Sequence, residues 1–411
     1  MFKFERAGGA IRQRDFRLLW AAQSLSSAGD AVASVAVPFA VLEVGGSVSE
    51  VGMVLAVKAL VRLVLVLVGG VWSDRLPRRL VALSTFALGA AVQLLVALLL
   101  YTGHCRMWHL VLAAAVLGAG FAFSRPALTA MLRESVPAAQ IQAASSLNSL
   151  TRSIADVVGP AAGGVLLAYV GVSLAYLVDG ATFVLAAVFL CLYTTEVARG
   201  KRQDFIADLR AGWTEVRDRG WFLVNIIAHA CWNMGFSAFL VLAPVLSRSE
   251  FGGARAWGMM SAGLGVGAVL GCLISLTWVP RRPLVVANAA LIPGALPLLS
   301  LGHGLPLPVI VVCCGVSSLG LAVLNEVWTA VVSQSFPMEV MGRVNSYDSM
   351  LSMVALPLGM AVSGPLSTWV GAEATLSFAA AVLALPCLVV ICMPQVRSIR
   401  FDRQGLVVSP S

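Results

Sequence analysis

Charged residues are scarce in this chain. Asp, Glu, Lys and Arg make up 12% of its 411 residues, 59% are hydrophobic, and the mean hydropathy is +0.89. A soluble domain needs a polar surface, so this composition excludes a soluble globular protein. Apolar runs of about 20 residues, long enough to cross a hydrocarbon core of ~30 Å, recur along the chain.

Residues that carry common enzyme chemistry are also few. The chain has three lysines and no G-x-x-x-x-G-K-[ST] motif, so we do not expect ATP hydrolysis. Its four histidines are scattered, without an HExxH motif or a His/Cys cluster that would indicate a metal site. No Ser–His–Asp set can be argued, and the eight cysteines form no CxxC. We therefore predict no enzyme activity, no cofactor and no metal.

The apolar runs predict an all-α membrane protein with twelve transmembrane helices. An N-terminal six-helix bundle would occupy residues 1–195, and a C-terminal bundle residues 222–411. Residues 196–221 between them fit either an amphipathic helix on the cytoplasmic membrane face or a solvated linker. The polar tail from Gln395 is expected to be disordered. The predicted spans are 17–43, 49–72, 78–101, 108–132, 143–168, 171–194, 222–246, 256–278, 283–302, 307–335, 345–369 and 372–394.

The net charge of +8 predicts the orientation of these spans rather than binding to nucleic acid. With the N-terminus in the cytoplasm, cytoplasmic segments hold 21 Lys and Arg residues, outer loops hold three, and four lie inside spans. By the positive-inside rule, both termini are cytoplasmic. The basic first 17 residues and the long first span indicate a retained anchor rather than a cleaved signal.

The chain repeats itself at an offset of 200 residues. Ungapped comparison of 125–171 with 325–371 gives 13 identical pairs out of 47, including Gly159 with Gly359 and Gly171 with Gly371. Two homologous hydrophobic halves are typical of a transporter that binds its substrate between them.

The loop between spans 2 and 3 contains one glycine, one aspartate and three arginines within ten residues: Gly70, Asp74, Arg75, Arg78 and Arg79. It resembles the G-x-x-x-D-R-x-G-R-R loop of the major facilitator superfamily, with Pro77 where the second glycine is usual. The resemblance implies a gating loop. A carboxylate at this place can cap a helix N-terminus and pair with arginines across the bundle seam.

Span 5 carries a second motif, formed by Ala155, Gly159, Pro160, Gly163 and Gly164. It resembles the antiporter motif of the exporters in that superfamily, with alanine at the first glycine. Small residues permit close helix packing, and a proline permits a bend. The resemblance implies export rather than import.

Two further stretches, 15–30 and 337–346, are similar to the exporter branch that includes macrolide efflux proteins and the enterobactin exporter. The resemblance covers nearly the whole chain. It implies the major facilitator fold, two pseudo-symmetric six-helix bundles that alternate access to a site at mid-membrane.

Ionisable residues inside spans are candidates for the site, because a charge in the membrane is costly unless it is paired or functional. Lys58 and Arg62 share a face of span 2 and need an acid opposite, for which Asp30 is the expected partner. The pattern leaves open an inert structural network. We single out eight ionisable residues inside spans, of which only Glu326 is in the second half: Asp30, Lys58, Arg62, Arg125, Arg152, Asp156, Asp179 and Glu326.

Proton coupling requires a carboxylate whose pKa lies near neutral pH. Burial raises the pKa of a carboxylate, and a nearby cation lowers it. Asp30 is the first candidate and Glu326, beside Asn325, the second. Arg152 and Asp156 lie four residues apart and can pair within span 5. Trp232, Asn233, Phe236 and Trp328 are candidates for an apolar, aromatic cavity wall.

These patterns together predict a monomeric, multi-pass protein of a bacterial cell membrane. Its expected function is efflux of a lipophilic small molecule, such as an antibiotic, driven by the proton gradient and without ATP. Its expected partners are that molecule and the lipid bilayer, with no nucleic acid. The alternatives are a siderophore exporter, a proton symporter of the same fold, or a membrane receptor or sensor that transports nothing.

Overall fold

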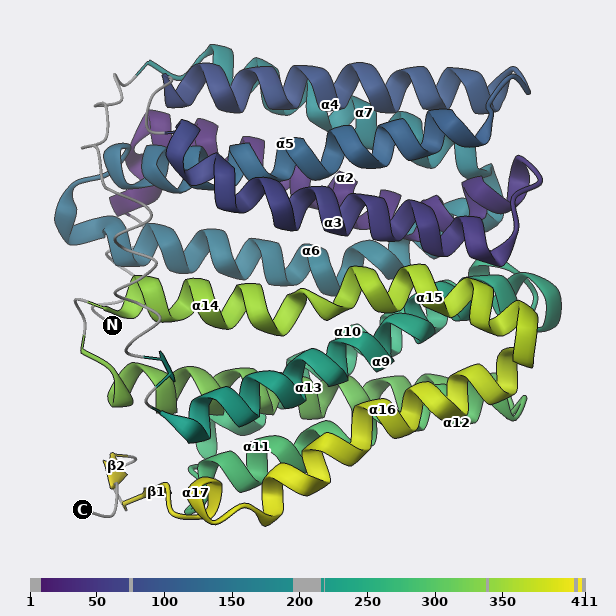
Figure 1. Cartoon of the computed structure of the whole chain (residues 1–411). Helices are drawn as coiled ribbons and strands as arrows, with labels where there is room; N and C mark the ends of the chain where they lie inside the picture. Colours follow the sequence, from purple (N-terminus) through teal and green to yellow (C-terminus); the bar gives the residue numbers. More distant parts are fainter. Residues whose placement is uncertain are drawn as a thin grey trace. The chain divides into compact units, whose positions relative to one another are not determined.

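A computed structural model of the chain describes residues 9–73, 77–194, 216–217, 219–337, 340–402 and 406–408, excluding the side chains of 67–73, 156, 342 and 408. It contains two compact units, each treated by itself below. Unit 1 is Met1–Ser47, Val57–Arg202 and Gly253–Gly258, and unit 2 is Val48–Ala56, Gln203–Gly252 and Met259–Ser411. Figure 1 shows the helices and their labels.

The predicted helices of the first half are present. They are α2 (Arg14–Glu43), α3 (Val48–Ser73), α4 (Arg78–Tyr101), α5 (Met107–Glu134), α6 (Ile141–Val170), with a short 3₁₀ turn η1 (Ala138–Gln140) before it, and α7 (Val172–Cys191). The first nine residues of α3 belong to unit 2 and the rest to unit 1.

The predicted helices of the second half are also present. They are α9 (Gly220–Glu250), α10 (Ala254–Thr277), α11 (Pro283–Leu291), η2 (Ile292–Gly294), α12 (Ala295–Gly302), α13 (Leu307–Ser335), α14 (Met341–Met353), α15 (Ala355–Val370) and α16 (Ala372–Cys392). Among the described residues, eleven helical segments are long and apolar enough to span a membrane, and α3, at 26 residues, has the length for a twelfth.

Two of the predicted spans are present but interrupted within their length. The span at 283–302 breaks at η2, where Pro293 has no N–H to continue the helical hydrogen bonding. The span at 345–369 divides at Val354 between α14 and α15, three residues before Pro357. Proline disrupts the turn that precedes it, which places both breaks on its N-terminal side.

The repeat read from the sequence is confirmed by the element boundaries. Helices α5, α6 and α7 begin at residues 107, 141 and 172, and α13, α14 and α16 begin at 307, 341 and 372. Gly171 and Gly371 have φ of 86° and 89°, a left-handed conformation that suits glycine, at the same helix–helix junction. Within unit 1, α2 packs against α6 and α7; within unit 2, α9 packs against α15 and α16.

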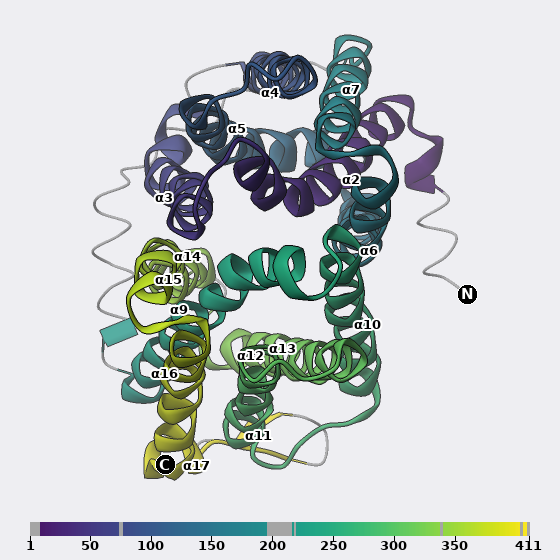
Figure 2. The same cartoon turned by 90° about the vertical axis from the view of Figure 1, so that its right-hand side faces the viewer.

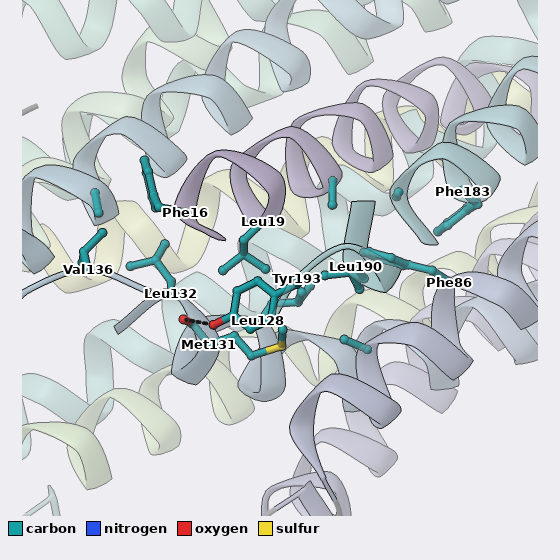
Figure 3. Packing of buried hydrophobic residues seen from close by; sticks show 14 of the residues in the cluster. Phe16, Leu19, Phe86, Leu128, Met131, Leu132, Val136, Phe183, Leu190 and Tyr193 are labelled. Carbon is teal, nitrogen blue, oxygen red and sulfur yellow. Dashed lines mark hydrogen bonds between the residues drawn. The ribbon is translucent and has the colours of Figure 1, made fainter. Parts of the chain in front are cut away.

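The core of unit 1 gathers at the ends of α2, α4, α5 and α7. Phe16, Leu19 and Met131 are fully buried there, and Phe86 and Phe183 lie 5.9 Å apart between ring centroids. Figure 3 shows the Tyr193 hydroxyl reaching the Met131 backbone, to which it donates at 3.3 Å. This core fixes the ends of four helices of unit 1.

Close packing of α4 on α7 depends on two glycines. A Cβ on Gly89 would meet the Phe183 ring, and a Cβ on Gly180 would meet Leu94. The two helices lie side by side over their length (Figures 1 and 2). This seam determines which polar side chains of α4 and α7 meet.

The C-terminal tail contradicts the expectation of disorder over its described residues. Pro394–Arg397 forms the short helix α17, and β1 (Arg400–Phe401) pairs with β2 (Val407–Val408) in an antiparallel hairpin. The backbone N–H of Val407 donates to Gln334 at 2.8 Å. Buried Val396 and Phe401 explain the order, because a short apolar alternation inside the polar tail packs against unit 2. The linker expectations at 196–221 fall almost wholly outside the described residues.

Candidate functional site

A pocket of about 370 Å³ lies inside unit 1 and is formed by α2, α3, α4, α5 and α6. Four of the charged residues singled out in the sequence line it: Asp30, Arg62, Arg125 and Arg152. The other lining residues are hydroxyl, amide and apolar side chains: Gln23, Ser26, Ser27, Ala31, Ser34, Phe86, Phe121, Ser124, Leu128 and Pro160.

The charged residues of the pocket lie well inside their helices. Arg125 is the nearest to a helix end, nine residues from Glu134, or about 14 Å at the rise of an α-helix. Charges at such depth do not face lipid cheaply, so their convergence on one pocket indicates a polar site within the membrane.

Arg62 and Arg125 lie against one aromatic ring. The Arg62 Cζ is 3.7 Å and the Arg125 Cζ 5.2 Å from the centroid of Phe121. Gly118 in α5 makes this approach possible, because a Cβ there would collide with the Lys58 carbonyl of α3. Stacking uses the face of a guanidinium and leaves its N–H edge available to the pocket.

Lys58 and Arg62 were both expected to face Asp30, but the structure gives them different partners. Arg62 lies close enough to Asp30 and Arg152 for electrostatic interaction. Lys58 interacts instead with Asp179 of α7 and does not line the pocket. The predicted partner of Arg152, Asp156, has a side chain outside the described residues.

The antiporter-like motif packs on α2 beside Asp30. A Cβ on Gly159 would collide with Ala31, and a Cβ on Gly163 would press on the Val32 backbone. Pro160 lines the pocket itself, while Ala155 and Gly164 are buried. The small residues of α6 therefore position the stretch of α2 that carries Asp30.

Polar contacts join the same two helices nearer their N-terminal ends. Asn148 of α6 donates its side-chain amide to Gln23 at 3.0 Å, and the Trp20 indole donates to Thr151 at 3.0 Å. Together with the glycine contacts, these bonds fix α6 against α2 along the wall of the pocket.

A buried carboxyl lies behind the pocket and was not among the predicted site residues. Asp179 of α7 is 0% exposed, and its Oδ2 accepts a short hydrogen bond from the Gln93 side-chain amide of α4. The sequence predicts the helix that carries Asp179, but it does not show that Gln93, 86 residues earlier, is the partner of this carboxyl. A buried glutamine in an apolar span was the available signal.

The gating-loop motif is only partly described. Asp74 and Arg75 lie outside the described residues, and Gly70 is described as backbone of α3 only. Arg78 forms a 2.8 Å ion pair with Glu134 at the end of α5. Arg79 donates to the carbonyls of Leu190 and Cys191, which end α7. The two arginines thus join α4 to α5 and α7 within unit 1.

The cavity-wall candidates of the second half lie in packed contacts of unit 2. Trp232 is 3% exposed, stacks on Phe236 at 4.8 Å and donates to the Leu291 carbonyl at 3.1 Å. Asn233 donates to the His229 and Ser352 carbonyls. These side chains bind helices together rather than line the pocket of unit 1.

The acids of unit 2 lie apart from the described pocket, and the predicted role of Glu326 in proton coupling stays a prediction. Asn325 and Glu326 are exposed on α13, and neither lines the described pocket. Asp348 of α14 is not among the eight ionisable residues singled out inside spans, although it falls within the predicted span 345–369. It accepts the Trp328 indole N–H at 2.9 Å and the Ser352 hydroxyl at 3.2 Å. The second half therefore carries at least two acids, not one.

A helical chain that repeats itself and encloses a polar pocket at span depth belongs to the class of multi-pass membrane transporters. Over residues 19–360 the sequence matches the profile described as Major Facilitator Superfamily. The chain belongs to the Major Facilitator Superfamily, as the motifs of spans 2 and 5 predicted.

The chain is similar to curated efflux proteins over nearly its full length. It is 28% identical to the multidrug efflux pump Tap of Mycobacterium tuberculosis over 413 residues, covering 96% of each chain. It is 21% identical to macrolide efflux protein A of Streptococcus pyogenes, covering 94% of this chain and 96% of that one.

Solved structures share the fold at low identity. A POT family transporter in complex with a thioalcohol-conjugated peptide gives a TM-score of 0.73 at 12% identity, covering 93% of this chain and 96% of that one. A bacterial homolog of the human lysosomal transporter Spinster, in an inward-facing conformation, gives 0.66 at 15% identity, covering 92% and 94%. These likenesses show the fold alone.

Proposed function

We propose that this protein exports a lipophilic small molecule from a bacterial cell in exchange for protons. The pocket of unit 1 carries the proposal, because it brings three arginines, one aspartate and an aromatic wall together at mid-span. Similarity to two kinds of efflux protein over more than nine-tenths of the chain supports the direction of transport.

In this proposal the pocket holds both the cargo and the coupling group. Phe86, Phe121 and Leu128 provide apolar surface for a lipophilic molecule, and serine hydroxyls provide hydrogen bonds. Among the described side chains that line this pocket, Asp30 is the only carboxylate. Its protonation changes the charge of the lining by one, so proton and cargo binding become linked.

The internal repeat supports alternating access as the mechanism. Two homologous halves that change their relative tilt expose a site between them to one side and then the other. Positive residues in the predicted cytoplasmic segments support a cell-membrane protein with both termini in the cytoplasm.

The test is accumulation of labelled compounds in pump-deficient bacteria that express the chain. The panel comprises erythromycin, tetracycline, ethidium and enterobactin, each with and without a protonophore. We expect lower accumulation of at least one compound and restoration by the protonophore. Equal accumulation of every compound, with the protein present in the membrane, would contradict the proposal for this panel.

Asp30→Asn tests the coupling group. We expect loss of the protonophore-sensitive part of export, because asparagine cannot take up or release the proton. Glu373→Gln is the matched control, since Glu373 is exposed in the first turn of α16 and does not line the pocket. Full pH-gradient-driven export by Asp30→Asn would remove Asp30 from the mechanism.

A further inference from the structure

The seam between α4 and α7 encloses a carboxyl group that the pocket does not use. Asp179 is 0% and Gln93 1% exposed, and the Gln93 Nε2 donates to the Asp179 Oδ2. Among the described residues, the remaining oxygen of each side chain, Asp179 Oδ1 and Gln93 Oε1, has no hydrogen-bond partner.

An ionised carboxylate fits this environment poorly. It presents two oxygens with several acceptor sites, and two neutral groups are the nearby donors. The Gln93 amide bonds to Oδ2, and the Thr182 hydroxyl, which lies beside the carboxyl, donates to the Asp179 backbone carbonyl at 2.7 Å. Burial of a charge without such donors is costly, more so inside a membrane. A proton on Asp179 supplies the O–H donor that Gln93 Oε1 lacks. The proton also removes the buried negative charge.

The unpartnered oxygen points toward the helix of the pocket. A Cβ on Gly29 of α2 would collide with Asp179 Oδ1 and with Thr182 of α7. Gly29 directly precedes Asp30, which lines the pocket. Asp30 and Asp179 therefore lie on adjoining helices, at a crossing where Gly29 leaves room for the Asp179 and Thr182 side chains.

Two charged residues on neighbouring helices act on Asp179. These are Lys58 of α3 and Asp30 of α2, both within range of electrostatic interaction. Tyr176 is a buried titratable neighbour on α7 itself. Two carboxyls that interact this closely do not ionise independently, so the charge of Asp30 governs proton binding at Asp179.

The repeat shows that this helix crossing does not require a carboxyl. In unit 2, Gly235 of α9 faces the Ala379 backbone of α16, as Gly29 of α2 faces Asp179 of α7. Ala379 stands 200 residues after Asp179, and it is buried at 7% exposure. In the second half the backbone of α16 itself approaches the glycine beside an alanine, so a carboxyl is not needed to fill such a crossing.

We propose that Asp179, paired with Gln93, is a second proton-binding site behind the pocket. It holds a proton while Asp30 is a carboxylate, and it ionises when Asp30 takes up a proton, so the two carboxyls share one proton and one negative charge. A proton that leaves Asp30 bonds to an ionised Asp179, which regenerates the Asp30 carboxylate. Its role in exchange depends on the proposed function, but its protonation does not.

Infrared spectroscopy of the full chain in lipid nanodiscs at neutral pH tests the protonation. A protonated carboxyl has a C=O stretch separate from that of a carboxylate. We expect a band that disappears in Asp179→Asn, shifts in Gln93→Leu, and persists in Glu326→Gln. If Asp179→Asn leaves the carboxylic-acid region unchanged while the variant elutes as a folded monodisperse protein, the proposal is wrong.

Proteoliposomes loaded with ethidium or erythromycin test the role in exchange. For Asp179→Asn we expect the compound still to move down its own gradient. An imposed pH gradient should speed up this transport at least tenfold less than it does in the wild type. Retained acceleration would exclude Asp179 from coupling. If the wild type shows the infrared band but transports no compound of the panel, the proton site stands and the proposed function fails.

Discussion

At the scale of single residues, glycines decide where charged groups can meet. Gly118 admits the α3 backbone beside Arg62, Gly180 admits Leu94 of α4, and Gly29 admits Asp179. Each missing Cβ lets a neighbouring helix approach closely, and at Gly118 and Gly29 the approaching atoms are polar. The sequence shows these glycines, but it does not show which residue occupies the space that each leaves.

Gly29→Ala is expected to destabilise unit 1. The added methyl group would overlap Thr182 and Asp179, so α7 must move away from α2, at a cost of about 1–3 kcal/mol. The measurement is the thermal unfolding midpoint of the purified protein in detergent, which should fall.

Gly120→Ala is the matched control for that substitution. Its added Cβ would have Thr85 as its nearest neighbour, at 3.9 Å, an ordinary van der Waals distance. Alanine also favours a helix by up to about 1 kcal/mol over glycine. The midpoint should therefore hold or rise; equal decreases for Gly29→Ala and Gly120→Ala would show that the overlap has no effect.

Residue-scale prediction from the sequence was strongest where charge was costly. Asp30, Arg62, Arg125 and Arg152 were singled out because they lie inside spans, and they line one pocket. Asp179 was counted but not placed in the site, because its partner Gln93 is neutral and lies on a helix distant in sequence. Pairwise contacts of this kind depend on helix rotation, which hydropathy does not specify.

At the scale of elements, breaks in helices create bonding groups that regular helices lack. At η2 the turn around Pro293 leaves the Leu291 carbonyl to accept the Trp232 indole at 3.1 Å. Gly294 makes room for the same indole, since a Cβ there would meet it. The break and the tryptophan of α9 therefore form one structural unit.

Trp232→Phe is expected to lower stability by about 1–3 kcal/mol, because the Leu291 carbonyl stays buried without its donor. The measurement is again the unfolding midpoint in detergent. Trp221→Phe is the control, since Trp221 packs against Trp328 and Phe336 and no indole bond of it is described. A larger loss in Trp221→Phe would show that ring size, rather than the bond, matters.

Spans were predictable as elements, but their interruptions were not. A run of about 20 apolar residues is sufficient to indicate a span, whatever its internal geometry. Proline inside a span is compatible with a bend, a kink or a full break, and neighbouring helices decide among them. The same reasoning explains the tail, whose order comes from the burial of Val396 and Phe401 and from its contact with α13.

At the scale of the whole molecule, the repeat is the property best predicted from the sequence. Its offset of 200 residues recurs in the helix boundaries and in local bonding. Thr129 and Thr329 each donate to the carbonyl four residues earlier, Arg125 at 2.9 Å and Asn325 at 2.7 Å. The halves have diverged in chemistry, since Arg125 faces the described pocket and Asn325 does not.

That divergence sets what the repeat can and cannot predict. Backbone geometry is shared, because glycines at equivalent positions make equivalent helix contacts. Charge is not shared, as Asp179 and Ala379 show. A substitution that acts through packing should therefore have similar effects in both halves, whereas one that acts through charge should matter mainly in unit 1.

Gly159→Leu and Gly359→Leu test the shared geometry. In unit 1 the leucine would collide with Ala31 of α2, and in unit 2 with Ser237 and Met234 of α9. Both variants should lose at least tenfold of the export shown by the wild type, because each separates α6 or α15 from the first helix of its half. Accumulation assays and membrane-protein levels together give the measurement.

Val158→Leu and Leu358→Val, one residue away, are the controls, since both side chains are more than half exposed and meet no such backbone. They should keep wild-type export and wild-type protein levels. If Gly359→Leu transports normally while Gly159→Leu does not, the close approach of α15 to α9 is not needed for transport. The antiporter-like motif would then act through its place beside Asp30 rather than through a geometry common to both halves.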